Sequence, residues 1–350
     1  MIQKLLAMFC LLALAATATA AEERIAMKMV KPPALKAGDT IALVAPAGVG
    51  DPKKVDAIEA GLAKLGLKVK RSANLTERYG YLGGTDEARA AGVMDAWRDP
   101  GVQGVFCITG GFGTTRMLDK LDYRFIRENP KVFTGFSDIT GLHLAIQRQA
   151  GLVTFHSPTS EYALSANAEE RPLQARYLWG MVMPGNAGGE PLALPDPVVY
   201  TDEGLTTKTL TIRGGKARGQ LTGGNLSLIQ ALMGTPWEIE TKDRILFIED
   251  VGEAPYRIDR MLSNLRLAGK LDSPAGVIFG QFSKCDPENP ERSFTVDDLI
   301  AEYFAKRHYP VVSRFPSGHV IDNATLPLGV MAELDADART LTLLESPLAP

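Results

Sequence analysis

Three residues whose types suit acyl transfer lie far apart in this 350-residue chain: Ser137, Glu249 and His319. A serine hydroxyl becomes a nucleophile when a base takes its proton, and histidine has an ordinary pKa suited to that task. A carboxylate can in turn fix the tautomer of the histidine. Taken one at a time, each of the three also has a plain structural explanation.

Ser137 lies where a strand should turn sharply into a helix. Residues 131–136, Lys-Val-Phe-Thr-Gly-Phe, predict a strand, whereas residues 139–149 have apolar side chains at helical spacing. A serine at such a junction stands above the carboxyl edge of a sheet, as in a nucleophile elbow, although Ile139 replaces the second glycine of the usual G-x-S-x-G pattern. The alternative is an ordinary helix N-cap, a position where serine is common.

A glycine-rich loop, residues 110–113, follows the apolar run of residues 104–108. Its sequence, Gly-Gly-Phe-Gly, lacks the Lys-Ser/Thr of a phosphate loop and the spacing of a dinucleotide fingerprint. Exposed amides in this loop could instead stabilise an oxyanion, together with the amide that follows Ser137 at a helix N-terminus. We therefore predict an oxyanion hole made by the backbone amides of Gly111 and Asp138.

The candidate carboxylate and base lie in the second half of the chain. Glu249 falls near the end of a predicted strand, residues 244–250, and His319 lies in a Pro-Ser-Gly-His loop. Glu249 could equally cap the next helix or pair with Arg257, and His319 could be a solvated loop residue. From the residues alone, both interpretations stay open.

Composition limits the other function classes. The formal net charge is −3 with no aromatic-interleaved basic run, so we expect no nucleic-acid partner and favour small molecules. The four histidines show no metal-binding spacing, and we expect no metal and no cofactor. Beyond the leader, Cys107 and Cys285 are too few for a disulfide framework, and a single bridge between them is left open.

Residues 1–20 are predicted to be a secretory signal peptide. A lysine near the start is followed by the apolar run of residues 5–16 and by small residues at 18–20. The run is short for a membrane span, so we favour cleavage over an uncleaved anchor helix. The mature protein is then expected in the periplasm or outside the cell, without a membrane attachment.

The predicted fold class is α/β, in two domains. Strands alternate with helices over residues 36–165, which predicts a doubly wound parallel sheet carrying the nucleophile elbow. Residues 166–205 are rich in Ala, Gly and Pro and are predicted as a linker. Residues 206–350 predict a smaller, mixed α/β domain that carries the Glu and His, with a hairpin over residues 208–221 and edge strands at 332–334 and 341–343.

Six ordered sequence blocks resemble the LD-carboxypeptidase family, which also contains the microcin-immunity peptidases. The resemblance spans almost the whole chain beyond the leader. The blocks are residues 110–113, 121–123, 135–140, 223–226, 248–262, and 318–319 with 325–327.

The resemblance implies a fold, an activity and a site. Carried over, the family's nucleophile is Ser137, its orienting carboxylate is Glu249 and its base is His319. Family members hydrolyse the bond between an L-centre and a terminal D-residue, which implies release of D-alanine from a murein-derived tetrapeptide or muropeptide. Relatives often have Arg where Thr109 stands, so the contact to the terminal carboxylate is open.

Two other functions are compatible with the same blocks. One is an immunity-type hydrolase of peptidyl-nucleotides or other amidated small molecules, and the other is a non-catalytic periplasmic binding protein for cell-wall peptides. A complete triad argues against a pure binder. The sequence does not specify the diamino acid or glycan of the substrate, or the oligomeric state, for which a homodimer is one option.

Overall fold

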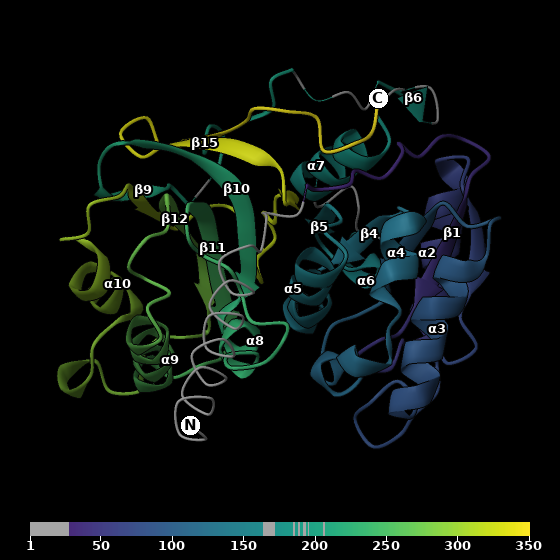
Figure 1. The fold of residues 1–350 in the computed structure, drawn as a ribbon, viewed down its shortest axis with the longest axis horizontal. Coiled ribbons are helices and arrows are strands. Elements are labelled where there is room, and N and C mark those ends of the chain that lie inside the picture. The colour runs from purple at the N-terminus through teal and green to yellow at the C-terminus, as the bar shows by residue number, and fades with distance from the viewer. Residues whose placement is uncertain are drawn as a thin grey trace, which may run out of the picture.

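The structure is a computed structural model that describes residues 28–163, 172–184, 186–187, 190–191, 194, 196–205 and 207–350. The predicted signal peptide, residues 1–20, lies outside the described residues, as do parts of the predicted linker. Within the described ranges, no helix combines the length and apolar character that a membrane crossing needs. The labels below are those of Figure 1.

The first sheet has strand order β14-β5-β4-β3-β1-β2, and its five N-terminal strands are all parallel. The order 2-1-3-4-5 is that of a doubly wound sheet whose topological switch point lies between β1 and β3. Loops that follow β1 and β3 therefore diverge around a crevice at the carboxyl edge. The strands are β1 (Thr40–Val44), β2 (Lys68–Arg71), β3 (Gly104–Cys107), β4 (Val132–Gly135), β5 (Thr154–His156) and β14 (Leu326–Leu328).

Helices cover both faces of this sheet. Buried residues of α3 and α5 belong to one hydrophobic cluster, and those of α2 and α7 belong to the other. Alternate strand residues supply the two clusters, as a sheet buried on both faces requires. The helices are α2 (Pro52–Lys64), α3 (Asp86–Arg98), α4 (Tyr123–Glu128), α5 (Thr140–Gln149), α6 (Ser160–Ala163) and α7 (Pro172–Val182).

The second sheet is mixed, with order β8-β16-β15-β10-β11-β12-β13-β9. Its central strands β10 to β13 are parallel, and β15 and β9 pair antiparallel with β10 and β13 on either side of them. The long strand β10 curves beside β15 over the top of the molecule (Figure 1). The strands are β8 (Val199–Tyr200), β9 (Leu210–Arg213), β10 (Lys216–Asn225), β11 (Arg244–Val251), β12 (Gly276–Ser283), β13 (Val311–Ser313), β15 (Met331–Asp335) and β16 (Thr340–Leu343).

Helices α8 (Leu226–Ala231), α9 (Pro255–Leu267) and α10 (Val296–Phe304) accompany the second sheet. Their buried residues lie in the same hydrophobic cluster as those of α3 and α5, so that core is continuous between the two sheets. A separate two-stranded ribbon joins β6 (Asn186–Ala187) to β7 (Glu190–Pro191). The α/β class, with a parallel-sheet unit followed by a mixed unit, is confirmed.

Two strand-pairing predictions were wrong. Strands β9 and β10 do not form a hairpin, because β9 pairs with β13 while β10 pairs with β11 and β15. Residues 332–334 and 341–343 are not edge strands, since β15 and β16 are each paired on both sides. Alternating polarity predicts that a segment is a strand but does not name its partner.

The chain is divided into two domains less cleanly than the predicted boundaries imply. The stretch predicted as a linker contains helix α7, whose Leu178, Trp179 and Val182 are buried, and strand β8 of the second sheet. Strand β14, from the predicted C-terminal domain, pairs antiparallel with β5 of the first sheet. This sharing of segments buries apolar surface of each unit against the other, and the hydrophobic effect favours that burial.

Candidate active site

Ser137 occupies a strained turn between β4 and α5. Its φ is +64°, a left-handed conformation that costs a non-glycine residue about 1–3 kcal/mol. Gly135, two residues before Ser137, has φ +155°, and a Cβ there would lie 2.9 Å from Ile139 Cγ2. Neither the short 3₁₀ turn at Ser137 nor α5 has a side-chain cap. The helix-cap interpretation is therefore wrong, and the strand-to-helix elbow is observed.

The structure brings the three candidate residues into one hydrogen-bonded chain. His319 Nε2 lies 2.9 Å from Ser137 Oγ, and His319 Nδ1 lies 2.7 Å from Glu249 Oε2. A carboxylate can only accept here, so Nδ1–H donates to Glu249 and Nε2 is left to accept the Ser137 hydroxyl proton. This is the tautomer that a general base needs.

Glu249 is completely buried at the end of β11. Its second oxygen accepts a hydrogen bond from Asn225 Nδ2 at 3.3 Å, and that amide also donates to Asp250 at 3.0 Å. Arg257 pairs with Glu253 at 3.6 Å and not with Glu249. The ion-pair alternative for Glu249 is therefore wrong.

The neighbouring carboxylate, Asp250, faces a different set of groups. It accepts from Ser227 N and Oγ and from Val251 N, at 2.8 to 3.0 Å. Burial raises the pKa of Asp250, and these hydrogen bonds oppose the rise. Asp250 thus anchors α8, whereas Glu249 reaches His319.

The loop that carries His319 approaches the Glu249 carboxylate most closely at Gly318. Gly318 has φ +126°, and a Cβ there would lie 3.0 Å from Glu249 Oε2. The Ser283 hydroxyl donates to the His319 carbonyl at 2.8 Å, and Gly318 forms a bridge with Gln281. The His319 side chain is only 16% exposed, which excludes the solvated-loop interpretation.

Phe136 packs on the ring of His319, with a centroid separation of 4.7 Å. Behind it lies His156, fully buried, with no hydrogen-bond partner for either ring nitrogen among the described residues. His143 donates to the Gly135 carbonyl and accepts from Thr154, and burial lowers its pKa to about 4. Burial also lowers the pKa of His156, so the two inner histidines are neutral neighbours of the site.

The glycine-rich loop lies directly over the serine. A Cβ added at Gly110 would lie 3.2 Å from Ser137 Oγ. Gly48 N donates to the Gly110 carbonyl at 2.9 Å. In a trans peptide the C=O and N–H point in opposite directions, so the Gly111 N–H points away from Gly48. The oxyanion role of the Gly111 and Asp138 amides remains a prediction that this geometry accommodates.

Sequence reasoning assigned no site role to Asn225. It follows two glycines, caps α8 through a bond from Leu228 N, and links both carboxylates of β11. Asn225 N also donates to Thr140 Oγ1, the first residue of α5. An asparagine after a glycine pair at the end of a strand was the available signal.

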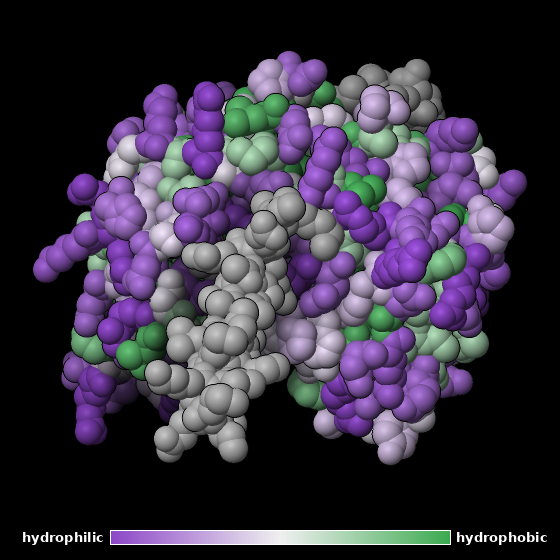
Figure 2. Space-filling view, viewed as in Figure 1, coloured by the Kyte–Doolittle hydropathy of each residue, from purple (hydrophilic) through white to green (hydrophobic). Residues whose placement is uncertain are grey.

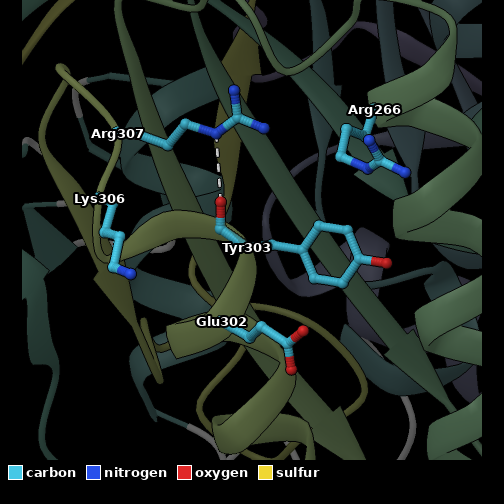
Figure 3. Close-up of a pocket in the computed structure, with 5 residues that line it drawn as sticks. All are labelled: Arg266, Glu302, Tyr303, Lys306 and Arg307. Carbon is cyan, nitrogen blue, oxygen red and sulfur yellow. Dashed lines mark hydrogen bonds between the residues drawn. The ribbon is translucent and has the colours of Figure 1, made fainter.

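Three surface hollows lie along α9, away from these residues. The one in Figure 3 has a volume of about 480 Å³ and lies between α9 and the end of α10. None of the three is lined by Ser137, Glu249 or His319. The hollow of Figure 3 is lined by Arg266, Glu302, Tyr303, Lys306 and Arg307.

The surface and the cysteines add little to the site. On the face shown in Figure 2, apolar residues are scattered among hydrophilic ones rather than gathered into a broad patch, and the homodimer option remains untested. Cys107 and Cys285 are both buried free thiols, so the bridge left open by the sequence is absent. Burial raises the pKa of Cys285 to about 11.

The family of the chain follows from comparison with known proteins. Residues 41–157 match the LD-carboxypeptidase N-terminal domain, and residues 218–334 match the LD-carboxypeptidase C-terminal domain. The chain belongs to the LD-carboxypeptidase family. The family resemblance stated from the six sequence blocks is thereby confirmed, and the protein is a serine-type LD-carboxypeptidase.

Individual relatives agree with this assignment. A probable murein peptide carboxypeptidase of Bacillus subtilis is 38% identical over 313 residues, covering 89% of this chain and 94% of the relative. The crystal structure of muramoyltetrapeptide carboxypeptidase from Oxalobacter formigenes is 27% identical, with TM-score 0.70 over 87% of this chain and 97% of the other. MccF bound to glutamyl sulfamoyl guanosine, 24% identical with TM-score 0.78 over 91% and 99%, shares the fold.

Proposed function

We propose that this LD-carboxypeptidase releases the terminal D-alanine from murein-derived tetrapeptides by acyl-enzyme chemistry on Ser137. The observation that carries the proposal is the continuous chain Ser137–His319–Glu249, with separations of 2.9 and 2.7 Å. Relatives at 38% and 29% identity are named for murein peptides and murein tetrapeptides, which supports the substrate class.

In the first step, Ser137 Oγ attacks the carbonyl carbon of the L-centre as its proton passes to His319 Nε2. The C–O bond forms and the carbonyl π electrons move onto oxygen, which the amides of Gly111 and Asp138 are proposed to stabilise. His319 then protonates the leaving amine, the C–N bond breaks, and free D-alanine departs.

In the second step, water replaces the amine. His319 takes a proton from the water as its oxygen attacks the ester carbonyl, and collapse of the second tetrahedral intermediate returns the proton to Ser137 Oγ. Glu249, buried and hydrogen-bonded to Nδ1, stabilises the imidazolium in both steps. Its burial shields this interaction from bulk solvent.

The test is digestion of defined muropeptides followed by mass spectrometry. A disaccharide tetrapeptide ending in D-alanine should lose one alanine, whereas the same stem ending in L-alanine should stay intact. The Ser137→Ala protein serves as the matched control. Release of L-alanine, or cleavage inside the stem, would contradict the proposed bond specificity.

An immunity-type hydrolase is a second candidate, and one observation favours it. Tyr81 and Phe112 are exposed and form an edge-to-face ring pair with centroids 5.8 Å apart, next to Gly111. Such a pair can stack on a nucleobase. A peptidyl-nucleotide offered beside the muropeptide separates the two functions by their relative kcat/KM.

We also propose that the enzyme acts after export. The support is the sequence of residues 1–20, with its short positive start, apolar run and small residues before Ala21. N-terminal sequencing of the periplasmic protein should begin near Ala21. Intact protein beginning at Met1 in the membrane fraction would support the anchor instead.

A further inference from the structure

Arg89 is an unusual residue because its charged side chain is completely buried in the first turns of α3. Its Nη1 donates to two backbone carbonyls, Pro46 O at 2.6 Å and Gly113 O at 2.7 Å. Its Nη2 donates to Asp86, an ion pair that offsets the cost of burying the guanidinium. A buried arginine is rarely placed without such partners.

The two carbonyls belong to the two loops that meet at the switch point of the first sheet. Pro46 lies in the loop after β1, and Gly113 ends the glycine-rich loop after β3. The loops also touch directly, because Gly48 N donates to Gly110 O at 2.9 Å. One guanidinium therefore connects both loops.

The hydrogen bond between Gly48 and Gly110 fixes the direction of the Gly111 amide. The Gly110 carbonyl is held by Gly48, so the N–H of the same peptide unit points the opposite way. A Cβ on Gly111 would lie 3.3 Å from Gly48 N, and one on Gly110 would lie 3.2 Å from Ser137 Oγ. The peptide unit is thus packed between Gly48 and the nucleophile.

A second brace holds the other end of the loop. Asp138 Oδ2 accepts from Thr114 N at 2.9 Å, and Thr114 Oγ1 donates to the Asp138 carbonyl at 2.7 Å. A Cβ at Gly113 would lie 2.7 Å from Arg89 Nη1, so the loop passes against the guanidinium without room for a side chain. Arg89 and Asp138 hold the loop at adjacent residues, Gly113 and Thr114.

We propose that Arg89 is a positioning residue for the oxyanion site: by tying the Pro46 and Gly113 carbonyls together, it aims the Gly111 amide at the oxygen of the tetrahedral intermediate. The inference rests on the proposed acyl-enzyme function. It differs from a purely structural role, in which loss of Arg89 would lower stability but leave the kinetics of each folded molecule unchanged.

The test uses Arg89→Lys, which keeps a positive charge but cannot reach both carbonyls and Asp86 with a planar fork. The kcat should fall about 10- to 100-fold while KM changes by less than about threefold, because the interaction strengthens only in the transition state. A peptide boronic acid, with boron in place of the scissile carbonyl, should bind weaker by a similar factor. Its adduct with Ser137 places an oxygen where the oxyanion forms.

The matched control is Arg116→Lys. Arg116 also pairs with Asp86, at 3.1 Å, but it is exposed, and its side-chain hydrogen bond goes to Asp86 rather than to either loop. Its kinetics and boronate affinity should equal those of the wild type. A folded Arg89→Lys enzyme with unchanged kcat and boronate affinity would overturn the proposal.

A second variant tests the positioning role of Arg89 if Arg89→Lys does not fold. Asp86→Asn leaves Arg89 in place but weakens the partner that orients it, and Asp86 is already 20% exposed. It should lower kcat and boronate affinity together, by about three- to tenfold, and no change in either would refute the role. Wild-type enzyme that binds no boronate would contradict the acyl-enzyme function itself, which separates the two failures.

Discussion

The proposed nucleophile, Ser137, and its proposed base, His319, are brought together by different structural means. Ser137 is positioned by chain close to it in sequence: β4, Gly135, a strained φ of +64° and the start of α5. His319 and Glu249 are 70 residues apart and meet only because β11, β12 and the loop after β13 lie side by side. The serine side is built by local conformation, whereas the base side depends on long-range pairing of strands.

The comparison teaches that the two sides should fail differently. Local conformation should hold Ser137 in place even when its hydrogen-bond partners are substituted. Substitution of Ser137 should therefore lower the catalytic rate rather than the stability. Glu249 and His319 share a 2.7 Å hydrogen bond, and Gly318 leaves no room for a Cβ beside Glu249 Oε2, so a small displacement of one residue should move the others. Coupled contacts of this kind are those for which mutational effects do not add.

The largest effect is expected for Ser137→Ala, which removes the nucleophile and leaves the elbow. Turnover should fall by at least about 10⁴-fold. The free energy of unfolding should fall by no more than about 2 kcal/mol, since the hydroxyl's hydrogen bond in the structure is to His319. Steady-state kinetics and urea unfolding on the same preparation measure both. A folded variant with near-normal turnover would exclude Ser137 as nucleophile.

Glu249→Gln should be next, with kcat lower by about 10²- to 10⁴-fold and KM little changed. The amide can still accept from Nδ1–H, but the charge that stabilises the imidazolium is lost. The upper limit follows the carboxylate-to-amide change known for the serine-protease triad.

Asp250→Asn is the neighbouring control for Glu249→Gln. It should cost stability through the Ser227 and Val251 contacts and lower kcat by less than about tenfold. If Asp250→Asn is the crippled enzyme and Glu249→Gln is not, the assignment of the carboxylate is wrong.

Gly318→Ala tests whether displacement travels along the base side. The added Cβ would lie 3.0 Å from Glu249 Oε2 in a left-handed backbone. We expect kcat to fall about tenfold and stability to fall by about 1–2 kcal/mol. Gly234→Ala adds the same kind of backbone strain at φ +77° with no atom within 4 Å, so it should cost stability alone. Equal kcat values for the two variants would argue against the coupling.

The last prediction concerns stability alone: a pH dependence that comes from the Ser137 side of the site. Burial lowers the pKa of His143 to about 4 in the folded protein, from an unfolded value near 6.5. The unfolded state therefore binds the proton first, and stability is lost as the pH falls from about 6.5 to about 4. The loss from this residue should approach 3 kcal/mol over that range.

His143→Gln should make this part of the stability profile less steep, because His156 still contributes a slope of the same sign, whereas exposed His308→Gln should leave it unchanged. Urea unfolding at pH 7.5, 6.5, 5.5 and 4.5 gives the comparison. A wild-type profile that does not fall between pH 6.5 and 4.5 would contradict the buried neutral state of His143.

The same local versus long-range difference decided what the sequence could reveal. The strand, the glycine loop and the serine elbow were predictable because hydrophobic period and turn residues report on nearby chain. Glu249 and His319 had sound alternatives until the family resemblance was invoked, since no local pattern reports a contact across 70 residues.

Two long-range features were not predicted at all. Arg89 was an ordinary charged residue in a helix until the structure placed its guanidinium between two loops. No strand was predicted for residues 325–327, although Leu326–Leu328 forms β14. Pro327 argues against a central strand, and β14 is an edge strand, where proline is tolerated.

Strand β14 also restricts how the chain can be divided into fragments that fold separately. Only seven positions after His319, the chain enters the sheet that carries Ser137, where Leu326 pairs with His156. A gene cut between the two family regions would leave the first fragment without its sixth strand and with the edge of β5 bare. Such fragments should aggregate or recombine rather than fold separately. Because the chain passes from His319 directly into β14, a hinge motion that separated the two sheets would also displace His319. We therefore expect peptides to enter through movement of side chains and loops around the site.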